Sequence, residues 1–242
     1  MKKIEIAPIG IIRSCYTEKF GIPRQPGLVK SAVAELELYP PWNRETLVAG
    51  IESFSHIWVQ FLFSEAVAEG WRDTVRPPRL GGKKRVGVFA SRSPHRPNHI
   101  GMSVVKLLSV ENRKSGTVLI VSGGDFLDKT PILDIKPYVP YSDCVEGASS
   151  SYSGKFSAID VVFKEAASSF CRDYQKITGR NLRLLIEEVL LQDPRPASQK
   201  QNRKEFGLML WDVNVRFSVV NNENNSNTVT TISVDSCETA ES

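Results

Sequence analysis

Residues 56–63 read H-I-W-V-Q-F-L-F and form the most hydrophobic stretch of this 242-residue chain. A short apolar run of this kind suits a buried strand. It is far shorter than the about 20 apolar residues that a membrane-spanning helix needs. The stretch therefore predicts a strand inside the core of a globular protein.

Further strand candidates lie on both sides of this stretch. They are residues 4–13, 32–38, 85–90, 102–110, 117–122 and 131–135. Partial alternation of apolar and polar residues is typical of half-buried strands, and evenly spaced turn signals are typical of a closed or nearly closed sheet. A short helix is expected around residues 44–53, because Pro40 and Pro41 precede it.

The composition changes after Tyr141, where residues 142–155 are small and polar and resemble a linker. The elements expected beyond it are a strand at 156–163, helices at 166–176 and 182–191, and strands at 213–219 and 228–234. This order predicts a small β-α-α-β-β domain over residues 156–234. Residues 235–242 are polar and are expected to form a disordered tail.

Overall composition indicates an ordinary globular protein, with 41% hydrophobic and 24% charged residues. Its four cysteines are far apart in sequence, so neither a zinc site nor a redox pair is indicated. The N-terminal segment lacks the apolar run of a secretory signal, and we expect a cytoplasmic location and no membrane association. No G-x-G-x-x-G, P-loop or G-x-S-x-G motif is present, so a Rossmann domain is not indicated.

Basic residues cluster between residues 72 and 96, where only Asp73 opposes them. The cluster comprises Arg72, Arg76, Arg79, Lys83, Lys84, Arg85, Arg92 and Arg96. Such a cluster can neutralise the phosphates of a nucleic acid. A solvated loop that keeps the protein soluble explains the same residues, and the local charge does not decide between the two interpretations.

Two proline-rich loops present polar side chains on a stiff backbone. Residues 21–27 read G-I-P-R-Q-P-G and expose Arg24 and Gln25, which suits either a ligand contact or a structural turn. Residues 91–101 read S-R-S-P-H-R-P-N-H-I-G. The prolines there disfavour the helix that would align its two histidines on a metal, so we predict no metal site. Arginines in this loop suit contacts to anions or bases.

Two further segments carry polar residues at turns. Within residues 123–138, G-G-D-F-L-D-K-T-P-I-L-D-I-K-P-Y, a turn of Asp128, Lys129, Thr130 and Pro131 could hold the polar edge of a small ligand. Q-D-P-R-P at residues 192–196 is either a helix stop or a rigid segment that points Arg195 toward the first domain.

Together these segments resemble the TsaA-like family of bacterial tRNA (adenine-N(6))-methyltransferases. The motifs that carry the resemblance are P-R-Q-P-G from Pro23, F-S-H-I-W from Phe54, R-P-P-R-L-G-G from Arg76, G-V-F-A-S-R-S-P-H-R-P-N from Gly87, D-x-T-P from Asp128 and D-I-K-P-Y from Asp134. They occur in the family's order and span residues 4–141, and a weaker match continues through Q-D-P-R-P.

The resemblance implies a mainly β fold, with a TsaA-like β-barrel at residues 1–141 that binds the methyl donor and a smaller α+β C-terminal domain. It implies S-adenosylmethionine as the donor and a homodimer as the assembly. The implied acceptor is the N6 amine of threonylcarbamoyl-adenosine at position 37, next to the anticodon of tRNA(Thr)-type substrates.

By motif matching, the resemblance also implies which residues contact the donor. These are Pro23, Arg24, Gln25, Ser64, Glu65, Arg92, Met102, Asp128, Lys129, Thr130 and Pro131. The chain departs from the family pattern at two places. Ser64 and Glu65 replace a pair that usually begins with histidine, and Lys129 stands where glycine is usual.

For catalysis, we hypothesise that Asp134 or Tyr138 accepts or polarises the proton of the acceptor nitrogen. The residues expected to bind the tRNA substrate are Arg72, Arg76, Lys83, Lys84, Arg85, Arg96 and Arg195. An alternative hypothesis is a non-catalytic RNA-binding barrel, similar to an oligonucleotide-binding fold. A small-molecule hydrolase is disfavoured, because the chain has only three histidines and no nucleophile motif.

Overall fold

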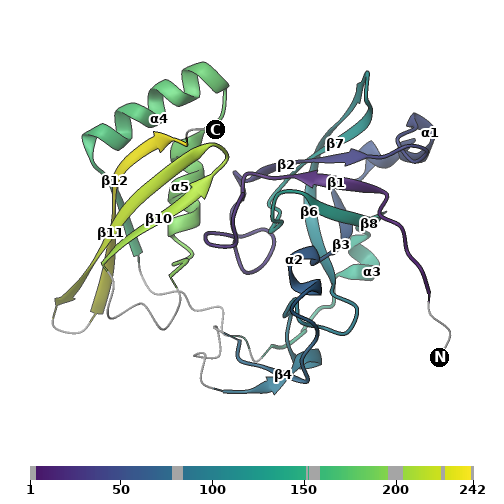
Figure 1. Cartoon of the computed structure of the whole chain (residues 1–242), viewed down its shortest axis with the longest axis horizontal. Coiled ribbons are helices and arrows are strands. Elements are labelled where there is room, and N and C mark those ends of the chain that lie inside the picture. Colours follow the sequence, from purple (N-terminus) through teal and green to yellow (C-terminus); the bar gives the residue numbers. More distant parts are fainter. Residues whose placement is uncertain are drawn as a thin grey trace.

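The computed structural model describes residues 4–77, 84–150, 152, 159–195, 204–224 and 227–240. Two β-sheet units lie side by side, and the N-terminal unit is a closed barrel (Figure 1). Its strands are β1 (Gly10–Arg13), β2 (Val33–Leu38), β3 (His56–Leu62), β6 (Ile100–Arg113), β7 (Gly116–Ser122) and β8 (Thr130–Pro137). The predicted mainly β, barrel-containing fold is confirmed.

Neighbouring barrel strands are antiparallel and follow the order β1-β2-β7-β6-β3-β8 before β8 closes on β1. Closure pairs every strand on both sides and leaves no exposed sheet edge. Strand β3 alternates as its sequence predicts, with Ile57, Val59 and Phe61 buried in the barrel core. Gly10 is required in β1, because a Cβ there would lie 2.4 Å from the carbonyl oxygen of Glu37.

Short elements surround the barrel and form part of its loops. They are α1 (Glu45–Val48), η1 (Ile51–Ser53), α2 (Ser64–Val67), β4 (Thr74–Val75), β5 (Val86–Gly87), η3 (Val88–Ala90) and α3 (Pro140–Asp143). The helix expected around residues 44–53 is therefore two short turns. The strand expected at residues 85–90 is mostly wrong, since only two of its residues pair and a 3₁₀ turn follows them.

The C-terminal unit is a four-stranded sheet with two helices on one face. Its elements are β9 (Ile159–Phe163), α4 (Glu165–Thr178), α5 (Leu182–Leu190), β10 (Glu205–Leu210), β11 (Val213–Asn224) and β12 (Asn227–Thr239). The strand order is β10-β11-β12-β9, with β9 parallel to β12. The smaller α+β unit is thus present, and β10 is an additional strand that the predicted β-α-α-β-β order lacks.

Strand β12 also corrects the expected tail, because residues 235–239 continue it rather than forming a disordered segment. Their backbone pairs with β11, where Val215 faces Cys237 and Val213 faces Thr239. Asp235 additionally forms an ion pair with Lys164, with 2.7 Å between the charged atoms. Backbone pairing stabilises this stretch although its side chains are polar.

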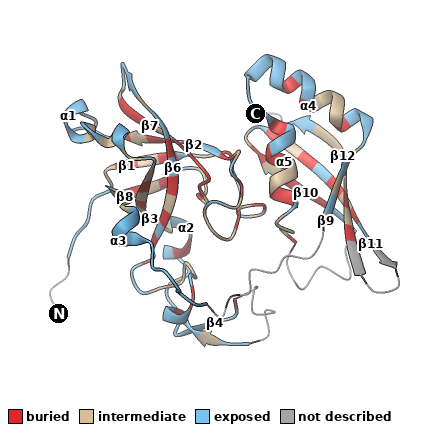
Figure 2. Cartoon of the chain, turned by 180° about the vertical axis from the view of Figure 1, so that it is seen from behind, coloured by how far each residue is buried: buried red, intermediate tan, exposed pale blue. Residues whose placement is uncertain are grey.

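A long loop between β1 and β2, residues 14–32, joins the two units. Its buried side chains Cys15, Tyr16, Val29 and Ala32 belong to the hydrophobic core of the C-terminal unit (Figure 2). The backbone N–H of Trp211 donates to the Cys15 carbonyl at 2.7 Å. This loop contains the P-R-Q-P-G motif, so the C-terminal unit helps to fix that motif in place.

Candidate functional site

Three cavities adjoin at the barrel rim, and Arg24 and Arg92 line all of them. We call them the β6 cavity (about 340 Å³), the α2 cavity (about 450 Å³) and the β4 cavity (about 310 Å³), after the element that forms one wall of each. The guanidinium of Arg92 donates a hydrogen bond to the side-chain oxygen of Gln25. The two proline-rich loops, far apart in sequence, thus meet at this place.

Most of the predicted donor contacts line these cavities. Gln25 and Met102 line the β6 cavity, and a second group lines the α2 cavity. The members of that second group are Pro23, Ser64, Glu65 and Thr130. Side chains from separate motifs therefore share one continuous region, as a single ligand site requires.

Asp128, Lys129 and Pro131 are not among the residues that line the three cavities. The Asp128 carboxylate accepts a hydrogen bond from the backbone N–H of Ser14 at 2.9 Å and so holds the β1–β2 loop. Lys129 has a φ of 63°, in the left-handed region that favours glycine. This geometry explains why the family pattern has glycine at that position.

Asp134 and Tyr138 also lie away from the described cavity walls. Asp134 is on β8 opposite Gln60, and its carboxylate accepts a hydrogen bond from the N–H of Ile135 at 2.9 Å. Tyr138 packs near the Trp58 ring, with 5.8 Å between ring centroids. Within this chain, the proton-acceptor role suggested for either residue stays a prediction.

The residues expected to bind tRNA are distributed unevenly. Arg76 lines the β4 cavity and Arg96 the β6 cavity, whereas Arg85 donates to the Thr74 hydroxyl at 2.9 Å. Lys84 is exposed. Lys83 lies outside the described residues.

Arg195 differs from the exposed contact that the sequence suggests. Its side chain is 4% exposed and forms an ion pair with Asp193, with 2.7 Å between the charged atoms. The Asp193 carboxylate holds this guanidinium, and the tRNA-binding role expected for Arg195 stays a prediction.

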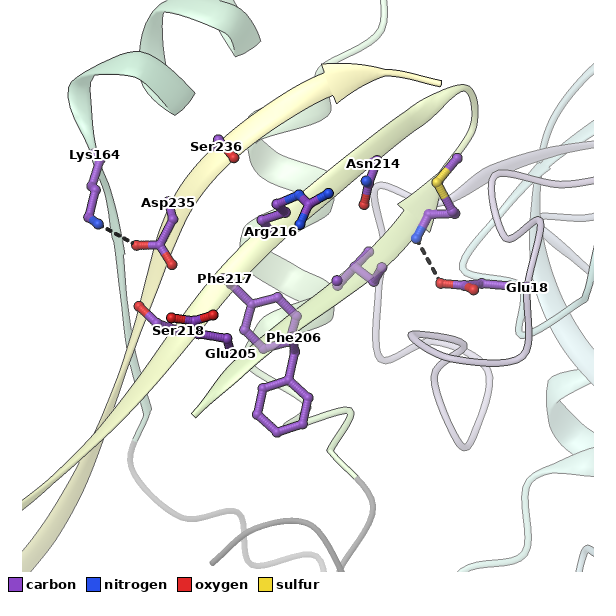
Figure 3. Close-up of a pocket in the computed structure, with 13 residues that line it drawn as sticks. Glu18, Lys164, Glu205, Phe206, Asn214, Arg216, Phe217, Ser218, Asp235 and Ser236 are labelled. Atoms are coloured by element: carbon purple, nitrogen blue, oxygen red, sulfur yellow. Dashed lines mark hydrogen bonds and ion pairs between the residues drawn. The ribbon is translucent and has the colours of Figure 1, made fainter. Parts of the chain in front are cut away.

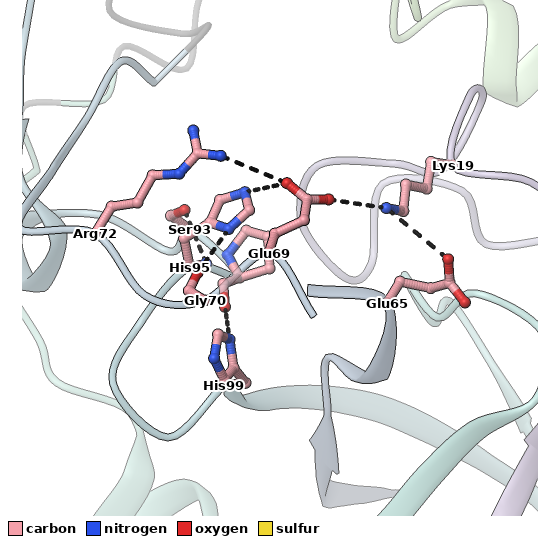
Figure 4. Close-up of polar contacts among 9 residues, drawn as sticks. Lys19, Glu65, Glu69, Gly70, Arg72, Ser93, His95 and His99 are labelled. Atoms are coloured by element: carbon pink, nitrogen blue, oxygen red, sulfur yellow. Dashed lines mark hydrogen bonds and ion pairs between the residues drawn. The ribbon is translucent and has the colours of Figure 1, made fainter. Parts of the chain in front are cut away.

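A network of charged side chains forms one wall of the α2 cavity (Figure 4). The Glu69 carboxylate lies 3.7 Å from the Lys19 ammonium, 3.5 Å from the Arg72 guanidinium and 3.7 Å from Nε2 of His95. Lys19 also lies 4.0 Å from Glu65. These pairs connect the β1–β2 loop, α2 and the loop at residues 91–99, so Arg72 has a structural partner rather than a free side chain.

The sequence analysis did not single out Asp125, which lines both the β6 and α2 cavities. Its carboxylate accepts a hydrogen bond from the Ser103 hydroxyl at 2.6 Å. Desolvation by burial raises the pKa of Asp125 to about 6, although the Ser103 hydrogen bond and the charge of Arg92 act in the opposite direction. The sequence feature that could have pointed to Asp125 is its position directly after two glycines that follow a buried strand.

The apolar part of the site consists of aromatic rings. Phe61 and Phe63 line both the β6 and α2 cavities, with 5.0 Å between their ring centroids. Gly101 makes room for Phe61, because a Cβ at residue 101 would lie 2.3 Å from that ring. Aromatic rings, two arginines and a carboxylate fit a ligand that has a flat base, a carboxylate and a positive charge.

The described residues contain no group of three or more His, Cys, Asp or Glu side chains that could hold a metal ion. Both histidines of the loop at residues 91–99 instead contact backbone carbonyl oxygens. Nδ1 of His95 lies 3.3 Å from the Gly70 oxygen, and Nδ1 of His99 lies 2.9 Å from the Pro94 oxygen. No helix among the described residues is long and apolar enough to cross a membrane.

A larger cavity of about 790 Å³ lies on the open face of the C-terminal sheet (Figure 3). Its wall includes Glu18, Lys164 and Arg216. The barrel-rim motifs contribute no residue to its described lining apart from the β1–β2 loop residue Glu18. We therefore place the functional site at the barrel rim.

Fold and rim cavities together describe a β-barrel protein in which two proline-rich loops meet at one candidate ligand site. Family models agree with this class. The tRNA-methyltransferase O N-terminal domain matches residues 11–144, and the TrmO C-terminal domain matches residues 157–235. The chain belongs to the TrmO family of methyltransferases, and the resemblance found in the sequence is confirmed.

Individual relatives extend over nearly the whole chain. A tRNA (adenine(37)-N6)-methyltransferase of Escherichia coli is 47% identical over 227 residues, which are 90% of this chain and 94% of the relative. A putative S-adenosylmethionine-dependent methyltransferase of Pseudomonas aeruginosa is 45% identical over 214 residues, which are 88% and 91%. The crystal structure of TrmO from Pseudomonas aeruginosa aligns with a TM-score of 0.76 at 37% identity and covers 98% of this chain and all of that one.

Proposed function

We propose that this protein is an enzyme that transfers the methyl group of S-adenosylmethionine to N6 of adenosine 37 in tRNA. The observation that carries the proposal is the convergence of Arg24, Arg92 and Thr130, from three separate motifs, on the α2 cavity. The family membership of the chain and the names of its relatives support the same reaction.

When bound, the donor supplies a methyl group that a nucleophile takes as the sulfonium loses its charge. The enzyme's main task is then to hold the nucleophile in line with that methyl group. Arg24 and Arg92 are placed to bind the donor's carboxylate, because a guanidinium can form two parallel hydrogen bonds with it. Phe61 and Phe63 supply apolar walls that exclude water and suit a flat base.

The finer acceptor that we propose is threonylcarbamoyl-adenosine in tRNA(Thr)-type substrates, on the basis of the family resemblance. The β4 cavity adjoins the donor region and is lined by Arg76. This arginine provides positive charge beside the place where a modified nucleoside would enter.

We also propose that the enzyme acts as a homodimer in the cytoplasm, where its tRNA substrate is found. Several large apolar side chains of the barrel unit are strongly exposed in the single chain, among them Met102 (55%), Trp71 (58%) and Phe89 (78%). Met102 lines the β6 cavity, so a second subunit seated there would complete that cavity.

Methylation is tested with purified protein, S-adenosylmethionine and two tRNA(Thr) samples that differ in whether adenosine 37 is threonylcarbamoylated. Mass spectrometry of the digested nucleosides should show a mass gain of one methylene group on the threonylcarbamoylated adenosine alone. Methylation of the unmodified tRNA instead would contradict the finer acceptor but keep the reaction.

Calorimetry with S-adenosylmethionine alone separates the proposal from a non-catalytic RNA-binding barrel. We expect saturable donor binding in the absence of tRNA. Absence of binding, together with absence of methylation in either tRNA sample, would favour the RNA-binding module. Light scattering of the purified protein tests the homodimer, and a monomeric mass at working concentration would reject it.

A further inference from the structure

Asp125 lies at the place where the two largest rim cavities meet. It belongs to the segment between β7 and β8, and the Ser103 hydroxyl from β6 fixes one carboxylate oxygen at 2.6 Å. The backbone N–H of Asp125 also donates to its own carboxylate, and Ser103 is the one side chain that binds it among the described residues. The side chain lines both the β6 and α2 cavities, so a ligand in either one can reach this carboxylate.

The other charged side chains that line these two cavities are either cations or carboxylates that form ion pairs. The cations are Lys19, Arg24, Arg92 and Arg96. The other carboxylates, Glu65 and Glu69, form ion pairs with Lys19, and Glu69 also faces His95. None of the ion pairs among the described residues involves Asp125, and Arg92 acts on it only through longer-range attraction.

We propose that Asp125 is the group that accepts the N6 proton of the acceptor adenosine during methyl transfer. This assignment rests on the proposed function. The N6–methyl bond forms as the methyl–sulfur bond breaks, and its electron pair stays on sulfur, which becomes a neutral thioether. The proton released from N6 goes to the Asp125 carboxylate and leaves to solvent after the product departs.

The electrostatics of the site favour this direction of proton transfer. A positively charged donor next to Asp125 stabilises the carboxylate and lowers its pKa, so the base is ready while the donor is bound. When the sulfur loses its charge, the low-dielectric surroundings again favour the protonated carboxyl. The pKa of about 6 in the ligand-free protein is closer to neutrality than the usual aspartate value, as a general base requires.

Asp125 is better placed for this role within one chain than the residues suggested by sequence. Asp134 and Tyr138 line none of the three cavities, and the Asp134 carboxylate binds a backbone N–H. Asp125 contacts the cavities directly and does not need a second residue to act through.

The first test is single-turnover methyl transfer by wild type and Asp125→Asn with saturating donor. Asparagine is close to isosteric and keeps an oxygen for the Ser103 hydrogen bond, so folding is preserved. We expect the rate constant to fall by about 100-fold or more, the size typical of a lost general base. The wild-type rate should rise with pH until Asp125 is ionised, and this rise should be absent in Asp125→Asn.

Asp173→Asn is a matched control, because Asp173 is an exposed aspartate of α4 that pairs with Lys176. It should retain the wild-type rate and pH profile. A second readout does not depend on turnover. Carbon NMR of the Asp125 carboxyl should give a lower pKa with S-adenosylmethionine bound than with the neutral thioether product bound.

The assignment is overturned if Asp125→Asn keeps a rate within about fivefold of wild type, or if weaker donor binding measured by calorimetry accounts for the whole loss. An unchanged pH profile in the variant overturns it as well. Failure of the proposed function is distinguishable, because wild type would then methylate no tRNA at all.

Discussion

The barrel rim and the open face of the C-terminal sheet both contain cavities lined by charged residues, but the charges are arranged differently. On the sheet face, Lys164 pairs with Asp235 and Arg216 pairs with Glu238. At the rim, Arg24 and Arg92 line three adjoining cavities, and Asp125 enters no ion pair among the described residues. The larger cavity is on the sheet face, so we infer the functional site from the residues that meet at the rim and not from cavity size.

The C-terminal unit contributes to the site indirectly. Its helix α5 and strand β10 contact the β1–β2 loop, which carries Arg24 to the rim. We regard this unit as a support for the loop, and the three predictions below test the division of roles.

The largest expected effect is a difference in kcat/KM between alanine variants of two arginines, one from each region. Arg92→Ala removes a positive charge from all three rim cavities and the hydrogen bond to Gln25, so kcat/KM should fall about 100-fold. Arg216→Ala removes an exposed ion pair with Glu238, and such pairs are worth so little that kcat/KM should change less than about threefold. Steady-state methylation assays measure both, and similar losses in the two variants would refute the assignment of the site to the rim.

The second prediction concerns the effect of pH on stability. Burial raises the pKa of Asp125 to about 6, so folding favours its protonated form. The stabilisation from this group is fully present below the unfolded pKa of about 4 and is lost as pH rises through about 6. Asp125→Asn should therefore be more stable than wild type by about 2 kcal/mol at pH 7.5, an order-of-magnitude figure, and should lose that advantage near pH 4.

Urea unfolding between pH 4 and 8 measures this effect, and a control comes from the C-terminal unit. Lys176 lowers the pKa of Asp173, so Asp173→Asn should give no gain in stability at neutral pH. If Asp125→Asn is more stable than wild type but far less active, the rim keeps a destabilising carboxylate because catalysis needs it. Equal stability of wild type and Asp125→Asn at all pH values would contradict the raised pKa.

The sequence predicted much of the barrel, because alternation in β3 and the other strands directly reflects which side chains face the core. It also assigned the loops that carry Arg24 and Arg92 to one donor site, since the prolines in these loops restrict the backbone conformation. Strand β10 was missed because its apolar run is short and contains Gly207, and its pairing with β11 is visible only in three dimensions.

Site residues that depend on long-range packing could not be predicted. The raised pKa of Asp125 arises from burial, and the residues that act on its carboxylate, Ser103 and Arg92, lie far from it in sequence. Arg195 was expected on a rigid segment that points toward the barrel, yet its side chain is buried and the Asp193 carboxylate binds its guanidinium. The loop following a helix can fold back, and local composition does not reveal this.

The smallest expected effect tests the supporting role of the C-terminal unit. The Glu188 carboxylate of α5 accepts hydrogen bonds from the backbone N–H and the hydroxyl of Ser31, at 2.8 and 2.7 Å. Glu188→Ala should lower the free energy of unfolding by about 1.5 kcal/mol, because two donors lose a charged partner. The donor dissociation constant should rise about threefold as the β1–β2 loop loosens. A threefold rise corresponds to a loss of well under 1.4 kcal/mol of binding free energy.

Glu187→Ala is the matched control, because it removes a neighbouring glutamate of the same helix whose side chain has no recorded contact among the described residues. It should leave both the unfolding free energy and the donor affinity unchanged. If Glu188→Ala destabilises the protein while donor affinity stays at the wild-type value, the C-terminal unit stabilises the fold without positioning Arg24. The support role would then be confined to folding, and contacts within the barrel unit, such as Arg92–Gln25 and Ser14–Asp128, would hold the rim loops.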